Sequence, residues 1–139
     1  DAVISSPLIR ASQTAEIISE SIGVGPVLTN EGLNERDTGE WTGLTSVQIE
    51  EKWPNWEAEG VRPKGWEPDE LVAARATVAM LEIAKAYDNQ TVLVVTHSGV
   101  IIALEKELEI FKNKPLNLCG RVFTFNDNII MGGQAITLD

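Results

Sequence analysis

The segment TVLVVTHSGV, residues 91–100, decides the fold class of this chain. Residues 91–95 are apolar or β-branched throughout, which is typical of a strand buried on both faces of a parallel sheet. Residues 100–111 follow with a helical pattern. In open α/β sheets, ligands collect where such a strand leads into a helix. The segment therefore predicts an α/β fold, and it marks three candidate site residues: His97, Ser98 and Gly99.

The same strand, turn and helix pattern opens the chain. Residues 2–5, AVIS, predict a short strand that stops at Ser6-Pro7. Ser followed by Pro is a good N-cap and N1 pair, so we expect a helix to begin there. Arg10 would then lie near a helix start, where free backbone N–H groups favour an anion. Four apolar residues recur on one face of this helix: Ala11, Ala15, Ile18 and Ile22.

A polar loop and a lid-like region separate these two junctions. The loop, residues 31–43, carries Glu35, a carboxylate that could supply acid–base chemistry. Thr45 and Gln48 resemble a capping box, which predicts a short helix over residues 46–53. Gly and Pro then favour a loop up to Pro68. We expect one domain over residues 1–139 with a lid-like insertion at about 44–68, whose tryptophans serve packing.

The second half of the chain completes the predicted architecture. Asp69 can cap a long helix whose apolar stripe is expected at four positions: Leu71, Ala74, Val78 and Leu81. Residues 121–125 and 129–138 predict two strands joined by a tight turn. The sum is a three-layer α/β/α sandwich with a mostly parallel sheet and an antiparallel edge.

Composition excludes several classes of protein. Hydrophobic residues make up 43% and charged residues 23%, as in ordinary globular domains. The net charge of -10 disfavours a nucleic-acid partner, although a local cationic pocket could still bind a small phosphorylated substrate. No apolar run reaches the roughly 18 residues of a membrane span, and no signal peptide is visible. Cys119 is alone, which favours a reducing compartment. We therefore expect a cytoplasmic protein without a membrane partner.

Three segments together resemble the histidine phosphatase superfamily, whose fold is phosphoglycerate mutase-like. They are SSPLIRASQTA (5–15), LNERDTGEWTG (33–43) and VVTHSGVI (94–101), in the family's order and spacing. The resemblance implies that Arg10 binds phosphate, Glu35 is the acid–base residue and His97 is the second histidine of the pocket. The backbone around Ser98 and Gly99 would add to the phosphate cradle. The resemblance implies neither a metal nor a cofactor.

One family feature does not occur in this sequence. The family opens with a strand ending in Arg-His-Gly, whose histidine attacks phosphorus, whereas His97 is the only histidine here. We therefore expect a fragment that lacks the family's first strand and helix. The complete protein would hydrolyse phosphomonoesters through a phosphohistidine intermediate, and residues 1–139 alone would have little activity.

Other readings stay open. Mutase activity is less favoured, because Trp41 resembles phosphatase branches and the region before Pro68 is short, with only Arg62 and Lys64 for a second phosphate. A non-catalytic phosphate-binding module and an unstable folding fragment are further alternatives. Among phosphatases, a small broad-specificity enzyme and an α-ribazole-phosphate phosphatase fit the sequence equally well. The sequence is also compatible with a homodimer.

Overall fold

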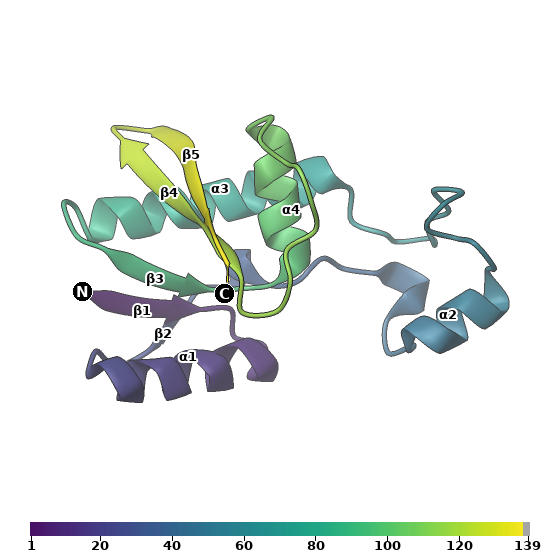
Figure 1. The fold of residues 1–139 in the computed structure, drawn as a ribbon, viewed down its shortest axis with the longest axis horizontal. Helices are drawn as coiled ribbons and strands as arrows, with labels where there is room; N and C mark the ends of the chain where they lie inside the picture. The colour runs from purple at the N-terminus through teal and green to yellow at the C-terminus, as the bar shows by residue number, and fades with distance from the viewer. Residues whose placement is uncertain (138–139) are drawn as a thin grey trace. The chain divides into compact units, whose positions relative to one another are not determined.

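The computed structural model describes residues 1–137, which divide into two compact units. The larger unit comprises residues 1–35 and 69–139, and the smaller one comprises residues 36–68. The α/β class predicted from the sequence is confirmed, because parallel strands alternate with helices in the larger unit (Figure 1).

The sheet of the larger unit has three parallel strands. They are β1 (Ala2–Ser5), β2 (Leu28–Thr29) and β3 (Val92–Val95), arranged in the order β2-β1-β3. Strand β3 was expected to be buried on both faces, and this is wrong, because Leu93 is 37% exposed. Among the strands described, β3 pairs only with β1, so its position at the edge explains the exposure.

Helices cover both faces of this sheet (Figure 1). Helix α1 (Ile9–Ile22) lies on one face, and α3 (Asp69–Ala86) and α4 (Ser98–Glu107) lie on the other. Gly23 ends α1 in the left-handed conformation, with φ of 69°, which glycine adopts without a steric penalty. Helix α4 is shorter than the predicted 100–111, because Glu109 takes a positive φ of 56° that a helix cannot continue through.

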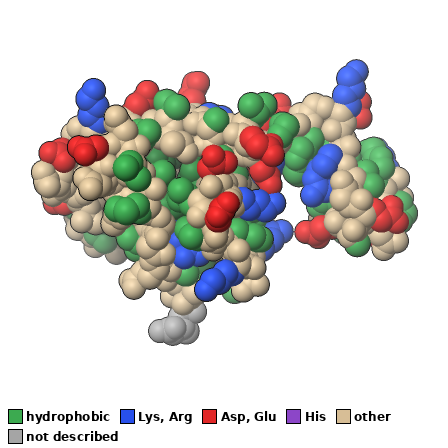
Figure 2. All heavy atoms as spheres, turned by 90° about the horizontal axis from the view of Figure 1, so that it is seen from above, with side chains coloured by type: hydrophobic (Ala, Val, Ile, Leu, Met, Phe, Trp, Pro, Cys, Tyr) green, Lys and Arg blue, Asp and Glu red, His purple; other side chains and the backbone are tan. Residues whose placement is uncertain are grey.

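Two predicted helix faces differ from the observed ones. In α1, Ala11 and Ala15 are buried, but Ser19 and not Ile22 completes the buried face. In α3, the expected stripe is wrong, because Leu71 and Val78 are exposed. The buried face of α3 consists of six other residues: Val72, Ala73, Ala76, Ala79, Met80 and Ile83. Figure 2 shows hydrophobic side chains exposed among polar ones on the face that it presents.

The core lies between the sheet, α3 and α4. Leu33, Val72 and Val100 are fully buried there, and Ile4 joins them from β1. Burying a side chain of this size stabilises the fold by about 1.5–3 kcal/mol. Leu33 belongs to the 3-10 helix η1 (Glu31–Leu33), so the segment that leads to Glu35 is anchored in this core.

A C-terminal hairpin packs against the same core. Strands β4 (Gly120–Asn126) and β5 (Ile129–Ile136) are antiparallel and form a sheet of their own. The predicted pair of strands is confirmed over these residues, and the predicted end at Leu138 lies outside the described residues. Three residues of the hairpin are partly buried against the core: Phe123, Phe125 and Ile130.

Residues 36–68 pack around Trp41. This residue is 3% exposed in the 3-10 helix η2 (Gly39–Trp41), and its ring lies 4.9–5.9 Å from those of Trp53, Trp56 and Trp66. Arg62 lies over two of these rings, at 5.7 Å from Trp56 and 5.0 Å from Trp66. Such cation–π contacts stabilise by about 0.5–1 kcal/mol each at exposed sites.

The predicted short helix of this unit is also confirmed. Helix α2 spans Ser46–Lys52, and its capping box is formed by Thr45 and Gln48 as expected. The Oγ1 atom of Thr45 accepts from the backbone N–H of Gln48 at 3.2 Å. The Gln48 side chain accepts in return from the Thr45 backbone N–H at 2.9 Å. Each bond satisfies a donor that a helix start leaves unpaired.

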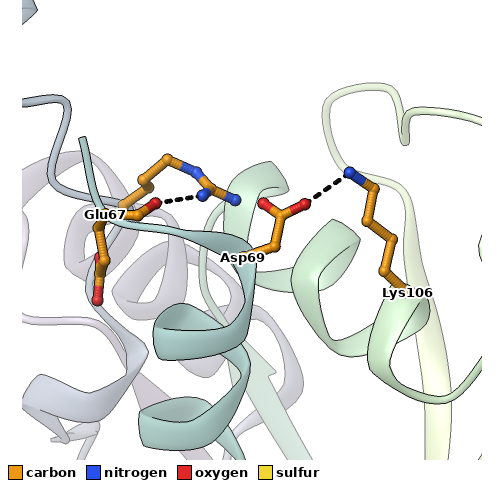
Figure 3. A network of polar contacts seen from close by, with 4 residues as sticks. Glu67, Asp69 and Lys106 are labelled. Carbon is orange, nitrogen blue, oxygen red and sulfur yellow. Dashed lines mark hydrogen bonds and ion pairs between the residues drawn. The ribbon is translucent and has the colours of Figure 1, made fainter. Parts of the chain in front are cut away.

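An exposed ion pair links α3 to α4. The Nζ atom of Lys106 lies 2.6 Å from Oδ2 of Asp69, and both side chains are more than a third exposed (Figure 3). Such surface pairs contribute about 0–1 kcal/mol.

Within residues 1–137, no helix combines the length and the apolar character needed to cross a bilayer.

Candidate active site

The carboxyl ends of the three parallel strands bring three loops together. Ser5 pairs with Thr29 of β2 and with Val95 of β3, so the chain leaves all three strands at the same level. Two backbone hydrogen bonds tie the loops just beyond this level. Ser6 N–H donates to Val95 O at 2.9 Å, and Asn30 N–H donates to Ser5 O at 3.0 Å. This edge is where α/β sheets place their ligands.

Ser6 is the buried centre of this edge. Its side chain is 0% exposed, and Oγ donates to Oδ1 of Asn34 at 2.9 Å. The same Oγ lies 2.9 Å from Nε2 of His97 and accepts from the Leu8 N–H at 3.2 Å. The prediction that Ser6-Pro7 begins α1 is wrong, because the helix begins at Ile9 with Leu8 as N-cap. The Ser6 hydroxyl contacts Asn34 and His97 and does not cap α1.

His97 occupies the start of α4. It is the N-cap residue and is 7% exposed, and its backbone oxygen accepts from the N–H groups of Val100 and Ile101. Burial is the main cause that lowers the pKa of His97 below its ordinary value of 6.5. The Glu35 carboxylate opposes this shift, whereas the charges of Arg10 and Arg75 reinforce it. The unliganded imidazole is therefore held toward its neutral form at neutral pH.

Glu35 reaches the same helix start. A Cβ atom placed on Gly99 would overlap Oε1 of Glu35, so the carboxylate lies directly against the Gly99 backbone. Only glycine leaves room for this approach. Ser98, the first residue of α4, is exposed beside it. Glu35, His97 and Gly99 are thus brought together as a carboxylate, an imidazole and a helix N-terminus.

Arg10 lies apart from this hydrogen-bonded group. Its side chain is exposed in the first turn of α1, the second residue of that helix. Its link to the site is electrostatic, because its positive charge contributes to the lowered pKa of His97. Arg10 is thus close enough to act electrostatically on His97, and its guanidinium is exposed rather than buried in the core.

Sequence reasoning missed the residues that hold the Glu35 loop. Nη1 of Arg75 donates to the backbone oxygens of Gly32 and Asn34, both at 2.8 Å, and Nη2 donates to Glu35 O at 3.3 Å. Thr96 Oγ1 also donates to this loop, at 2.7 Å from Leu33 O. Arg75 stands alone in the apolar stretch LVAARATVAM of α3, and that isolation was the only signal in the sequence.

One hollow elsewhere in the described chain does not suit a phosphate. A hollow of about 180 Å³ between α3 and α4 is lined by Asp69, Glu70, Ala103, Lys106 and Glu107. Its three carboxylates oppose an anion. Within residues 1–137, no group of three or more His, Cys, Asp or Glu residues has the arrangement of a metal site.

Comparisons with known proteins identify the family of this chain. The family model of the histidine phosphatase superfamily (branch 1) matches residues 1–119. The uncharacterized phosphatase PhoE of Bacillus subtilis is 30% identical over 86% of this chain and 61% of its own length. A 2,3-bisphosphoglycerate-dependent phosphoglycerate mutase of Methylobacterium radiotolerans is 30% identical over 78% of this chain and 56% of its own.

A solved structure extends the likeness to three dimensions. The native structure of a mycobacterial glucosyl-3-phosphoglycerate phosphatase matches with a TM-score of 0.64 and 30% identity. The match covers 77% of this chain and 56% of that one. The present chain thus spans only 56% to 61% of the length of these three proteins.

Proposed function

Because the chain belongs to the histidine phosphatase superfamily (branch 1), we propose that the complete protein hydrolyses phosphomonoesters through a phosphohistidine intermediate. The observation that carries the proposal is the meeting of the Glu35 carboxylate and His97 at the N-terminus of α4. A proton donor, an anion-binding helix end and a nearby cation are the parts that metal-free phosphoryl transfer needs besides a nucleophile.

The nucleophile is proposed to come from outside residues 1–139. These residues contain one histidine, and His97 is already bonded through Nε2 to Ser6 in a buried position. A second histidine would attack phosphorus and form a P–N bond while the ester P–O bond breaks. Water would then attack the phosphohistidine, which releases inorganic phosphate and regenerates the free imidazole.

Each residue of this chain has a distinct part in that proposal. Arg10 and His97 would donate to the non-bridging oxygens of the phosphoryl group and stabilise the charge of the transition state. The N–H groups of Ser98 and Gly99 would add to this cradle. Glu35 would protonate the leaving alkoxide and, as the carboxylate, take a proton from the attacking water.

Phosphoglycerate mutase activity is the second candidate. The mutase of Methylobacterium radiotolerans is as similar to this chain as the phosphatase PhoE, at 30% identity each. Hydrolysis is favoured because Arg62, one of the two basic residues between Trp53 and Pro68 that could meet a second phosphate, already lies over Trp56 and Trp66. Assaying 3-phosphoglycerate for conversion to 2-phosphoglycerate separates the two activities.

The expected partner is a small phosphorylated substrate in the cytoplasm. The net charge of -10 opposes nucleic acid, and a single cysteine suits a reducing compartment. Sedimentation of the complete protein would test whether it forms a homodimer.

The test compares residues 1–139 with the complete protein from the same gene, using p-nitrophenyl phosphate. The complete protein should turn over the ester, and the shorter chain should bind phosphate without turnover. Glu35→Gln should lower the rate of the complete protein by about 10²–10⁴-fold, as expected for loss of a general acid. Glu31→Gln, an exposed carboxylate in η1, is the matched control and should leave the rate unchanged. Robust turnover by residues 1–139 alone would contradict the proposal.

A further inference from the structure

We propose that Ser6 and Asn34 are positioning residues that hold neutral His97 in one tautomer, with the proton on Nε2 and the lone pair on Nδ1. The tautomer is a property of this chain alone and goes beyond the proposed function. Only the consequence for phosphate binding rests on that function.

The single hydroxyl proton of Ser6 decides the tautomer. A serine hydroxyl donates one hydrogen bond and accepts two. Ser6 Oγ donates to Oδ1 of Asn34 at 2.9 Å, so its remaining contacts must be accepted. These contacts are the Leu8 N–H at 3.2 Å and Nε2 of His97 at 2.9 Å. Nε2 therefore carries a proton that it donates to Ser6.

The opposite arrangement has a definite structural requirement. If the amide of Asn34 were rotated, its NH₂ group would donate to Ser6 Oγ, and the Ser6 proton would turn to Nε2 of His97. The lone pair of the ring would then lie on Nε2 and its proton on Nδ1. The two arrangements predict opposite tautomers, so one measurement on His97 separates them.

Burial disfavours any arrangement that leaves one of these polar groups without a hydrogen bond. Ser6 is fully buried and His97 is 7% exposed, so water competes poorly for their hydrogen-bonding groups. An unmade hydrogen bond in such a place costs more than an exposed one, because the polar group loses its solvation without compensation. With Oδ1 of Asn34 facing Ser6, the hydroxyl donates one hydrogen bond and accepts two, and this arrangement fixes both the tautomer and the orientation of the ring.

The consequence concerns the proton that His97 exchanges. With Nε2 occupied, the titrating proton is the one on Nδ1, which is the nitrogen left for a ligand. Three charged groups act on it: Glu35 favours the imidazolium, whereas Arg10 and Arg75 oppose it. A phosphate dianion bound beside Nδ1 would tip this balance, so that phosphate binding draws a proton onto Nδ1 and gains a charged donor.

The test uses the one histidine of the chain as an unambiguous reporter. Residues 1–139 labelled with ¹⁵N contain a single imidazole, whose nitrogen shifts can be read by long-range ¹H–¹⁵N correlation above the pKa of His97. We expect a pyrrole-type Nε2 and a pyridine-type Nδ1. A pyridine-type Nε2 would overturn the proposal.

Three variants extend the test. Ser6→Ala should average the two nitrogen shifts, because it removes the acceptor for Nε2. Ser5→Ala is the matched control: Ser5 is equally buried, but its Oγ donates to the Ser6 backbone oxygen, and it should leave the tautomer unchanged. Asn34→Ala frees the Ser6 proton and should shift the population toward the Nδ1–H tautomer. Unchanged shifts in Asn34→Ala and Ser6→Ala would contradict the assignment, and if Ser6→Ala does not fold, the wild-type and Asn34→Ala spectra decide.

Inorganic phosphate separates the tautomer from the function. Phosphate should protonate Nδ1 in the wild-type chain and bind about tenfold more weakly to Ser6→Ala, as loss of one aligned charged donor predicts. A pyrrole-type Nε2 without any response to phosphate would contradict the proposed function and leave the tautomer assignment intact. A phosphate response centred on Nε2 would overturn the proposed role of Nδ1.

Discussion

The Nε atom of Arg121 lies 2.6 Å from Oε1 of Glu105, and this ion pair joins strand β4 to helix α4. The two side chains are only 14% and 5% exposed. Nη1 of Arg121 also donates to the backbone oxygen of Gly133 in β5 at 2.9 Å. The backbone oxygen of Glu105 caps the end of its own helix by accepting from Ile110 and Phe111. The pair therefore fastens the hairpin to the helix whose other end carries His97.

Breaking this pair should destabilise the chain strongly. Arg121→Met leaves the buried Glu105 carboxylate without its partner, which costs about 3–5 kcal/mol of unfolding free energy. The comparison is Lys106→Met, which removes the exposed pair with Asp69 and should cost less than about 1 kcal/mol. Urea unfolding followed by circular dichroism measures both. Equal costs for the two variants would contradict the importance given to burial.

Two substitutions of Arg75 should separate the effect of its charge on His97 from the effect of its hydrogen bonds on the Glu35 loop. Arg75→Met removes the positive charge that lowers the pKa of His97, so that pKa should rise. Arg75→Lys retains the charge but not the fork that holds three carbonyl oxygens, so it should loosen the Glu35 loop with little change in the pKa. In the complete protein we expect a loss of activity on the order of 10-fold from Arg75→Lys.

The readouts for Arg75 are a ¹³C NMR titration of His97 and hydrogen exchange over residues 32–36. Lys85→Met, near the exposed end of the same helix, is the control and should change neither. A fall in the His97 pKa on Arg75→Met would be the wrong sign and would refute the electrostatic role.

Chain stability should decrease as the pH falls below about 6.5, where His97 is protonated more readily in the unfolded chain. The pKa of His97 is lowered in the folded chain, so the unfolded state binds more protons between its pKa and the folded one. Neutral His97 therefore makes its full contribution to the stability of the folded chain above about pH 6.5. This contribution is lost as the pH falls from there to the pKa of His97 in the folded chain. Melting temperatures of the wild-type chain and His97→Asn, compared from about pH 8 to pH 5, should converge as the pH falls. A difference that widens toward acid would contradict the direction of the shift.

Trp41 should control the folding of residues 36–68. Trp41→Ala removes the buried ring that the other three tryptophans contact and should cost that unit about 3–5 kcal/mol. Hydrogen exchange protection within residues 36–68 should be lost. Val47→Ala, an exposed apolar residue on α2, should stay within about 0.5 kcal/mol of the wild-type chain. Retained protection in Trp41→Ala would show that the unit does not depend on this ring.

Local patterns in the sequence predicted the elements better than their faces. The strand AVIS, the glycine cap at Gly23 and the capping box at Thr45 each depend on neighbouring residues, and all three are present. The buried face of α3 could not be read in this way. Apolar residues occupy nearly every position from Leu71 to Ile83, so periodicity does not distinguish the face that meets α4 from the one that meets solvent.

The site residues also divide into those that local motifs predicted and one that depends on long-range contacts. His97, Glu35 and Gly99 lie in recognisable motifs, and the structure brings them together. Ser6 gave no comparable signal, because its partners Asn34 and His97 are 28 and 91 residues away in the chain. Its sequence neighbourhood instead favoured a helix cap. A long-range hydrogen bond overrode a local preference there.

The tryptophan cluster has a practical consequence for optical measurements. All four tryptophans of the chain lie within residues 41–66, so tryptophan fluorescence observes only the smaller unit. A melt followed by tryptophan fluorescence would not report directly on the parallel sheet or on the loops around His97. Coincidence of that melt with a far-ultraviolet melt, to which the helices of the larger unit contribute most, would indicate that both units unfold in one cooperative transition. Two separate midpoints would reveal an intermediate in which one unit is folded and the other is not.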